Sequence, residues 1–239
     1  ELGEPQTLTQ EETAETIVPD YCPDIARIIS AEGVVCLHGG TEQDGVTGTV
    51  RVTVLYTPEN ESGVRALEFA MPFSAQGEGL AGCAHVVVET EIELLESRML
   101  NPRKIFTRCK LVTHLAGCRK VCLTISSDAE TDPALLVEKR CCGQTVSLLR
   151  QVAEKDLTFS ETMSLSLGRE GAAELLHCRA NGIVTETKAI GNKLIFKGVF
   201  LVSALYRTIG GQLASASAEL PFSQIMERSE EHTSELQSL

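Results

Sequence analysis

The sequence lacks tryptophan altogether, and aromatic residues make up only 4% of its 239 residues. It also lacks any apolar run close to the roughly 20 residues that a membrane-spanning helix needs. Lys and Arg total 21 against 33 Asp and Glu, which gives a net charge of -12. Phosphate backbones and anionic lipids repel such a chain, and few aromatic rings are present to stack on bases or sugars. These shortages predict no nucleic-acid partner and no direct membrane insertion.

Familiar catalytic signatures are missing as well. The sequence has no G-x-S-x-G elbow, no glycine-rich phosphate loop before a helix and no H-E-x-x-H motif. The carboxylates of Glu89, Glu91, Glu93 and Glu96 form an acidic face along a predicted strand. We interpret it as a solvated face, or a charged edge that resists aggregation, rather than an acid–base pair. We therefore expect no enzyme, no catalytic residue, no cofactor and no small-molecule ligand.

Nine cysteines are present, an odd number with no repeating spacing. This pattern is not that of a disulfide framework, and several cysteines lie within apolar alternation. We interpret it as a sign of a reducing, cytoplasmic compartment. The pair Cys118 and Cys122 has a spacing that zinc sites allow, but the adjacent Cys141 and Cys142 rarely both bind one tetrahedral ion. No metal site is expected.

An internal repeat is the strongest pattern in the chain. The segment GTVRVTVLY, residues 48–56, returns 150 residues later as GVFLVSALY, residues 198–206. The blocks Met71–Ser74 and Leu220–Ser223 follow in the same order, and Gly33–Val35 matches Gly182–Val184 upstream. Self-similarity at a fixed shift indicates a duplicated structural unit.

Each repeated block alternates as a half-buried strand does. In residues 49–56 the valines alternate with Thr and Arg, and a turn over Thr57–Gly63 predicts a hairpin with residues 64–73. Residues 85–95 and 104–115 predict two further strands. Each proline of the Pro-Phe-Ser blocks should lie at a strand end or bulge. Short helices are expected at 23–31, started by Pro23, and at 170–178.

We therefore predict a mainly β protein made of tandem β-sandwich-like modules with one short helix each. The first module spans residues 10–126 and the second spans 134–227. The second is expected to be incomplete and of low stability, because it lacks an equivalent of residues 75–125 and so exposes unpaired sheet edges. Residues 228–239 read like a translated sequencing adapter, and we set them aside as an artefact.

The stretch Pro19–Ile25, sequence PDYCPDI, is the most distinctive short motif. Cys22 could be a nucleophile near the positive end of a helix. The alternative is that Asp20 and Asp24 cap that helix and Pro23 starts it, and we favour this structural role.

Together with the repeated blocks, this motif makes the chain resemble the SPOCS-domain family of spore-coat morphogenesis proteins, which often carry several modules and a C-terminal LysM domain. The resemblance implies a family motif of unassigned role. Its residues are Pro19, Asp20, Cys22, Pro23, Asp24, Ile25, Tyr56, Pro72, Phe73, Ser74, Tyr206, Pro221, Phe222 and Ser223.

The resemblance further implies a non-enzymatic protein-interaction scaffold in spore-coat or spore-envelope assembly of an endospore-forming bacterium. Its expected place is the mother-cell cytoplasm at the forespore surface, and its expected partners are other spore-coat morphogenetic proteins. The alternative is a peptidoglycan-associated cell-envelope protein with a LysM part outside this sequence. Partner identity, binding face and oligomeric state are left open by the sequence.

Overall fold

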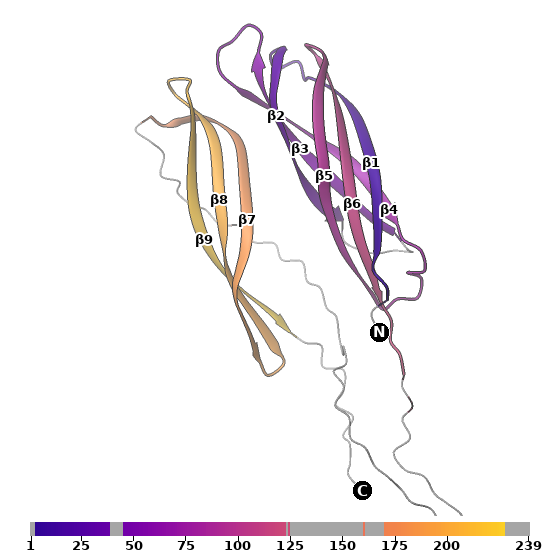
Figure 1. The fold of residues 1–239 in the computed structure, drawn as a ribbon. Helices are drawn as coiled ribbons and strands as arrows, with labels where there is room; N and C mark the ends of the chain where they lie inside the picture. The colour runs from indigo at the N-terminus through magenta and orange to yellow at the C-terminus, as the bar shows by residue number, and fades with distance from the viewer. Residues whose placement is uncertain (1–2, 39–44, 123, 125–159, 161–169, 228–239) are drawn as a thin grey trace, which may run out of the picture.

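The computed structural model describes residues 3–38, 45–122, 124, 160 and 170–227. Within these residues all regular structure is strand, arranged as three antiparallel three-stranded sheets (Figure 1). Sheet A has the order β1-β6-β5, sheet B the order β2-β3-β4 and sheet C the order β7-β8-β9. The strands are β1 Gln6–Ile17, β2 Ile25–His38, β3 Gly45–Pro58, β4 Arg65–Gln76, β5 His85–Asn101, β6 Lys104–Cys118, β7 Ala172–Ile190, β8 Lys193–Thr208 and β9 Leu213–Glu227.

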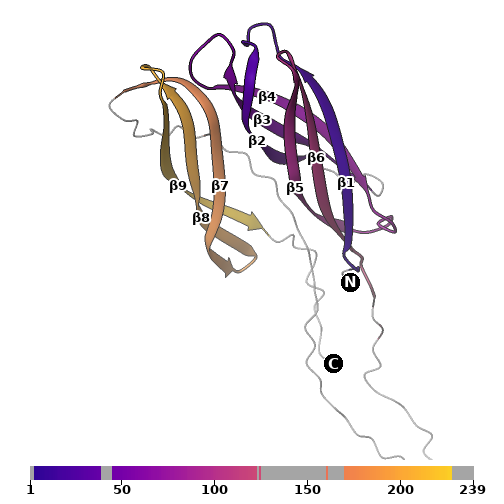
Figure 2. The same cartoon turned by 45° about the horizontal axis from the view of Figure 1, so that its top comes forward.

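Sheets A and B pack face to face into a sandwich, which we call the first body (Figure 2). The alternation in β3 explains why: Val50, Val52 and Val54 all point inward and are at most 1% exposed. Ile105 and Leu111 of β6 meet them from the other sheet and are fully buried. Burying such side chains stabilises the fold by about 1.5–3 kcal/mol each. The predicted mainly β architecture is confirmed, and so are the strands at 85–95 and 104–115.

The central strand of sheet A has two different faces. Its inward Thr107 and Thr113 are fully buried, and each hydroxyl pairs with a hydroxyl of β5, at 2.8 Å to Ser97 and 3.1 Å to Thr90. Its outward cations pair with glutamates of both neighbouring strands. These exposed cross-strand pairs are Lys104–Glu15, Arg108–Glu96 and Lys110–Glu93.

The prediction of two short helices is wrong. Residues 25–38 form β2 and residues 172–190 form β7, and no helix occurs in the described part of the chain. The helix at 23–31 was predicted from Pro23 as its start, but the residues after Pro23 enter β2, whose register shifts between Ile25 and Arg27 and again between Ile28 and Ser30. An extra residue at a bulge breaks the period of two. Consequently the inward side chains of Ile25 and Ile28 are three residues apart, a spacing typical of a helix.

Sheet C repeats sheet B strand for strand. Tyr206 pairs with Leu175 and Ala214, as Tyr56 pairs with Ile28 and Arg65. The bulges of β2 recur in β7, between Ala172 and Glu174 and between Leu175 and His177. The register also corrects one sequence match: Gly182 lies opposite Phe200, the position that Val35 takes opposite Val50. Gly33 and Gly182 are therefore not equivalent.

The repeated Gly and Phe of the two hairpins form one contact. Gly48 pairs with Phe73 and Gly198 pairs with Phe222, and each phenyl ring lies over its glycine. A Cβ atom on Gly48 would lie 2.5 Å from Cζ of Phe73 and 2.9 Å from the carbonyl oxygen of Cys36.

The proline beside each of these phenylalanines does not lie where the sequence predicted. Pro72 and Pro221 lie inside β4 and β9, away from any strand end or bulge. Both strands are sheet edges, which pair on one side only and are where proline is tolerated within a sheet.

Replacing Gly48 by alanine should therefore destabilise the first body. The added methyl meets the Phe73 ring and backbone, so the expected loss is about 1–3 kcal/mol of unfolding free energy, measured by urea denaturation. Gly45→Ala is the matched control in the same strand, because its Cβ would meet only ordinary contacts of 3.4 Å or more. Equal losses of unfolding free energy in the two variants would show that the contact with Phe73 is not what requires glycine at position 48.

Candidate functional site

The loop Val18–Asp24, here called the Pro-Asp loop, joins β1 of sheet A to β2 of sheet B. It is therefore the place where the chain crosses between the two layers of the sandwich. The turn between β5 and β6 lies against it and supplies Arg103.

Arg103 holds the loop with both terminal nitrogens. Nη1 donates to the carbonyl oxygen of Cys22 at 2.7 Å, and Nη2 donates to that of Val18 at 2.9 Å. The same nitrogens reach the carboxylates of Asp24 at 3.0 Å and Asp20 at 3.3 Å. A planar guanidinium suits several fixed acceptors at once, so these donors are engaged within the chain.

Backbone hydrogen bonds complete the same joint. Val18 N–H donates to Arg103 O, and Ile25 N–H donates to Pro102 O, both at 2.9 Å. The carbonyl of Asp24 accepts from Glu59 N–H, also at 2.9 Å, in the β3–β4 turn. Three separate chain segments are thus tied at one end of the sandwich.

Tyr56 lies beneath the loop and is fully buried. Its hydroxyl donates to the carbonyl oxygen of Pro23 at 3.3 Å. Burial raises the pKa of Tyr56 to about 12, the nearby Cys22 thiol adds to the rise, and Arg65 and Arg103 oppose it. The tyrosine is therefore a buried support for the loop in its neutral form.

The structure changes the roles expected for the Pro-Asp motif. No helix follows it, so Asp20 and Asp24 are partners of Arg103 rather than helix caps. Cys22 is half-buried and packs against the core, and its N–H donates to Pro19 O at 2.9 Å. The arrangement is that of a structural joint.

The predicted motif residues do not form one cluster. Pro23 of the Pro-Asp loop bonds to Tyr56, whereas the block Pro72–Ser74 lies toward the opposite end of β3, because Phe73 pairs with Gly48. In sheet C, Tyr206 is 3% exposed and lies at the same register position as Tyr56. Its companions Pro221, Phe222 and Ser223 lie on the edge strand β9.

Sequence reasoning missed Arg103, which it placed only in a turn. The one signal in the sequence was chemical, since an arginine in a tight turn is a candidate ion-pair partner for aspartates of another loop. What the sequence could not show is that the turn and the loop share one end of the sandwich.

Possible metal ligands do not gather in the described ranges, where no group of three or more His, Cys, Asp or Glu could hold an ion. His114 pairs with the Thr7 hydroxyl at 3.0 Å. Cys141 and Cys142 lie outside the described residues. Across the described residues, no helix is long and apolar enough to cross a membrane.

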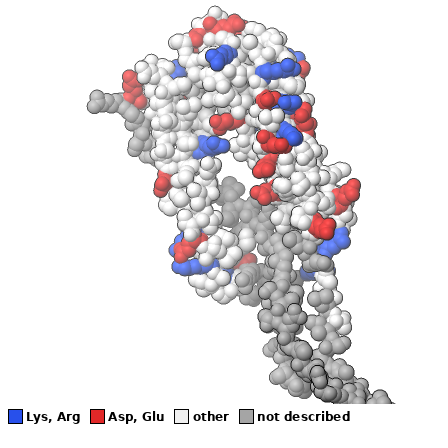
Figure 3. Space-filling model, in the orientation of Figure 1, with Lys and Arg blue, Asp and Glu red and all other residues white. Residues whose placement is uncertain are grey.

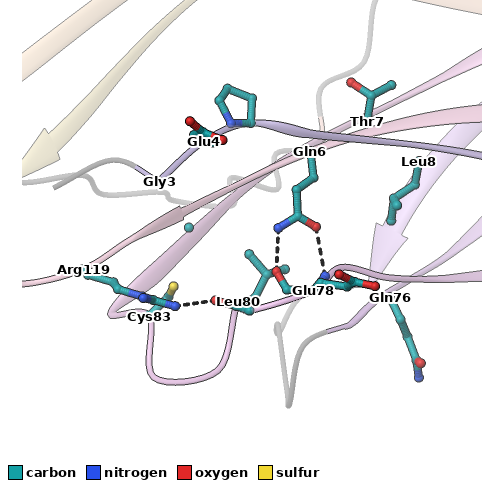
Figure 4. Close-up of a pocket in the computed structure, with 13 residues that line it drawn as sticks. Gly3, Glu4, Gln6, Thr7, Leu8, Gln76, Glu78, Leu80, Cys83 and Arg119 are labelled. Atoms are coloured by element: carbon teal, nitrogen blue, oxygen red, sulfur yellow. Dashed lines mark hydrogen bonds between the residues drawn. The ribbon is translucent and has the colours of Figure 1, made fainter.

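An open hollow lies at the end of the first body away from the Pro-Asp loop (Figure 4). Its lining includes Gln6, Glu78 and Arg119. The Gln6 amide bonds to the backbone N–H and carbonyl of Glu78, and Arg119 donates to the carbonyl of Gly79. These polar groups are used to hold the rim together, so the hollow resembles a packing gap more than a ligand site.

Sheet C contacts the first body through a charged junction. Glu174 accepts from Arg65 of β4 and from Arg207 of β8, both at 2.8 Å. The hydrogen bond from Arg207 holds the pKa of Glu174 below its ordinary value, with Arg65 adding to it. His177 lies 3.3 Å from Glu32 in the same junction.

Removing the Arg103 side chain should loosen the crossing between the sheets. Arg103→Ala is expected to cost about 2–3 kcal/mol in unfolding free energy, because two backbone carbonyls lose charged donors. Arg108→Ala is the control, since its ion pairs are solvent-exposed and should cost at most about 1 kcal/mol. If the two variants unfold at the same urea concentration, Arg103 does not stabilise the crossing between the sheets.

Alkaline pH should weaken the first body through Tyr56. Since its folded pKa is raised from 10.0 to about 12, its contribution is fully present below pH 10 and disappears as pH rises toward 12. The expected loss is about 2–3 kcal/mol. Cys109 adds to the fall from pH 9 to 11, because burial raises its pKa to about 11.

Urea unfolding at pH 8 to 12 measures this effect. Tyr56→Phe should flatten the curve between pH 10 and 12, while Tyr21→Phe should not, because Tyr21 is 88% exposed. An unchanged curve for Tyr56→Phe would show that the buried tyrosine is not responsible.

A family model matches the part of the chain that forms sheet C. Residues 172–235 match the family model described as SipL, SPOCS domain. The match begins at the first residue of β7, includes β8 and β9, and extends into the segment Arg228–Leu239. No curated protein and no solved structure matches the chain. Residues 172–235 therefore belong to the SPOCS-domain family.

Proposed function

We propose that this chain is a non-enzymatic interaction scaffold in the assembly of the spore coat or spore envelope of an endospore-forming bacterium. The SPOCS match carries the proposal, because the domain indicates a sporulation-related protein. The expected place is the mother-cell cytoplasm at the forespore surface, and the expected partners are other spore-coat morphogenetic proteins.

The use of the distinctive residues supports a scaffold over an enzyme. Arg103, Asp24 and Tyr56 bond to one another's segments and leave the guanidinium committed to holding the loop. A catalytic group has to present a reactive atom to a substrate, whereas these side chains spend their polar atoms on the fold. A rigid sandwich with broad sheet faces and edges is suited to binding other proteins.

The surface of the first body is also suited to protein contacts. Charged side chains of both signs are dispersed over it (Figure 3). On sheet A they form the exposed cross-strand pairs described above, which suit the polar, solvent-accessible rim of an interface.

Localisation during sporulation tests the proposal. A fluorescent fusion of the full chain, expressed in a sporulating endospore-former, should gather around the forespore on the mother-cell side. A Cys22→Ser fusion should gather equally, because the thiol has a packing role. The fluorescent protein alone is the control for diffuse signal.

Three outcomes would contradict the proposal in different ways. A fusion as diffuse as the fluorescent protein alone would remove the sporulation role. Signal in the cell wall would favour the peptidoglycan-associated alternative. Loss of localisation or function in the Cys22→Ser variant would favour a thiol-dependent activity.

A further inference from the structure

Sheet C meets the first body where one end of β7 lies beside sheet B (Figure 1). Glu174 near the start of β7 and Arg207 near the end of β8 face Arg65, the first residue of β4. The turns of the two equivalent hairpins also come together there. A Cβ atom on Gly63, in the β3–β4 turn, would lie 3.7 Å from Cδ of Arg207 and 3.8 Å from the carbonyl oxygen of Gly211 in the β8–β9 turn.

One carboxylate serves both sides of this contact. Oε2 of Glu174 accepts from Nη1 of Arg65 and from Nη2 of Arg207, each at 2.8 Å, and from Nε of Arg207 at 3.2 Å. Nη2 of Arg65 pairs with Glu61 within the first body. A carboxylate between two guanidinium groups makes charge-assisted hydrogen bonds to each and compensates both positive charges. Without Glu174, Arg65 and Arg207 would face each other across the contact.

The fold that the two copies share does not require these charges. In sheet B the register position of Glu174 is occupied by Arg27, and that of Arg207 by Thr57. In sheet C the register position of Arg65 is occupied by an alanine. Sheet B forms the same bulged strand and the same hairpin without an ion pair at this point. The charges that differ between the copies are thus the ones that the contact between the copies uses.

A second polar pair joins the two sheets at another strand. Nε2 of His177 in β7 lies 3.3 Å from Oε2 of Glu32 in β2. In sheet B the register position of His177 is occupied by Ser30, so this pair is also absent from the shared fold. Strands β2 and β4 are the two edges of sheet B. Attachment at both edges sets the orientation of sheet C, which a single ion pair would leave free to rotate.

The charged groups at the contact remain within reach of solvent and salt. The side chains of Arg65, Arg207 and Glu174 are 26%, 25% and 37% exposed. Salt shortens the range of interaction between such groups, from about 10 Å at 0.1 M to about 3 Å at 1 M ionic strength. Polar contacts between the domains of one chain resemble transient interfaces, so the domains can move apart.

We propose that Arg65, Glu174 and Arg207 form an ionic clasp that docks sheet C on the first body and releases it as ionic strength rises. Glu174 is its central residue, because it is the acceptor that both arginines share. Docking fixes the orientation of one module against the other, and release makes the two sheets independent. The clasp is therefore a conformational device within the chain.

Zero-length cross-linking of the full-length Arg65→Lys variant tests the clasp. A carbodiimide joins an amine to a carboxylate in contact with it, as an amide formed with loss of water. The new lysine should be cross-linked both to Glu61, within the first body, and to Glu174, in sheet C. The Glu61 product is the internal reference, because it forms in the docked and released states alike. Peptide mass spectrometry should show the ratio of Glu174 to Glu61 product falling about fivefold between about 50 mM and about 1 M NaCl.

Small-angle X-ray scattering of the full chain at low salt provides the second readout. Glu174→Gln should raise the radius of gyration to the value that the unsubstituted chain reaches at high salt. Glu186→Gln is the matched control and should not raise it. Glu186 is on the same strand and also loses two cationic partners, but both of them, Lys188 and Lys197, belong to sheet C.

Circular dichroism of each variant separates release of sheet C from unfolding. The proposal is overturned if the new lysine forms no product with Glu174, or if the product ratio does not change with salt. Equal radii of gyration for Glu174→Gln and Glu186→Gln would overturn it as well. None of these results would affect the proposed sporulation role, which the localisation experiment tests separately.

Discussion

Covering one apolar face of a three-stranded sheet is the constraint on which the rest of this structure depends. In β3, Val50, Val52 and Val54 present a continuous apolar row that would face water in an isolated sheet. Sheet A removes that row from solvent, and its own inward residues Ile105 and Leu111 are buried in return. Each sheet is thus stable through the other, as expected for a layered β domain.

Packing two sheets requires the chain to cross between them without leaving polar backbone groups unpaired. The Pro-Asp loop makes this crossing, and Arg103 satisfies two of its carbonyls while its backbone pairs with Val18. Tyr56 fills the space beneath and bonds to Pro23. The motif in which Cys22 could have been a nucleophile is thereby explained by its structural role, which is to hold the crossing between the two sheets of the sandwich. The scaffold role that we propose needs no reactive group.

Strands and their repetition were predictable because alternation and the 150-residue shift are local properties of the sequence. The strand over residues 25–38 could not be recognised from alternation in its first residues, since the bulges after Ile25 and Ile28 break the period of two. The site was predictable in part: Asp20, Asp24 and Tyr56 stood out, but their partner Arg103 is distant in sequence. Only the packing of the two sheets brings it to the loop.

Sheets B and C share one strand arrangement and register, but the described part of sheet A packs against sheet B. Hydrogen exchange of backbone amides in β3 and β8 tests most directly whether this coverage is what stabilises a sheet. Protection in β3 should be the higher of the two, because sheet A buries Val50 and Val52. Protection in β8 should be lower, because Phe200 and Val202 are only half-buried. Equal protection of β3 and β8 would contradict this account.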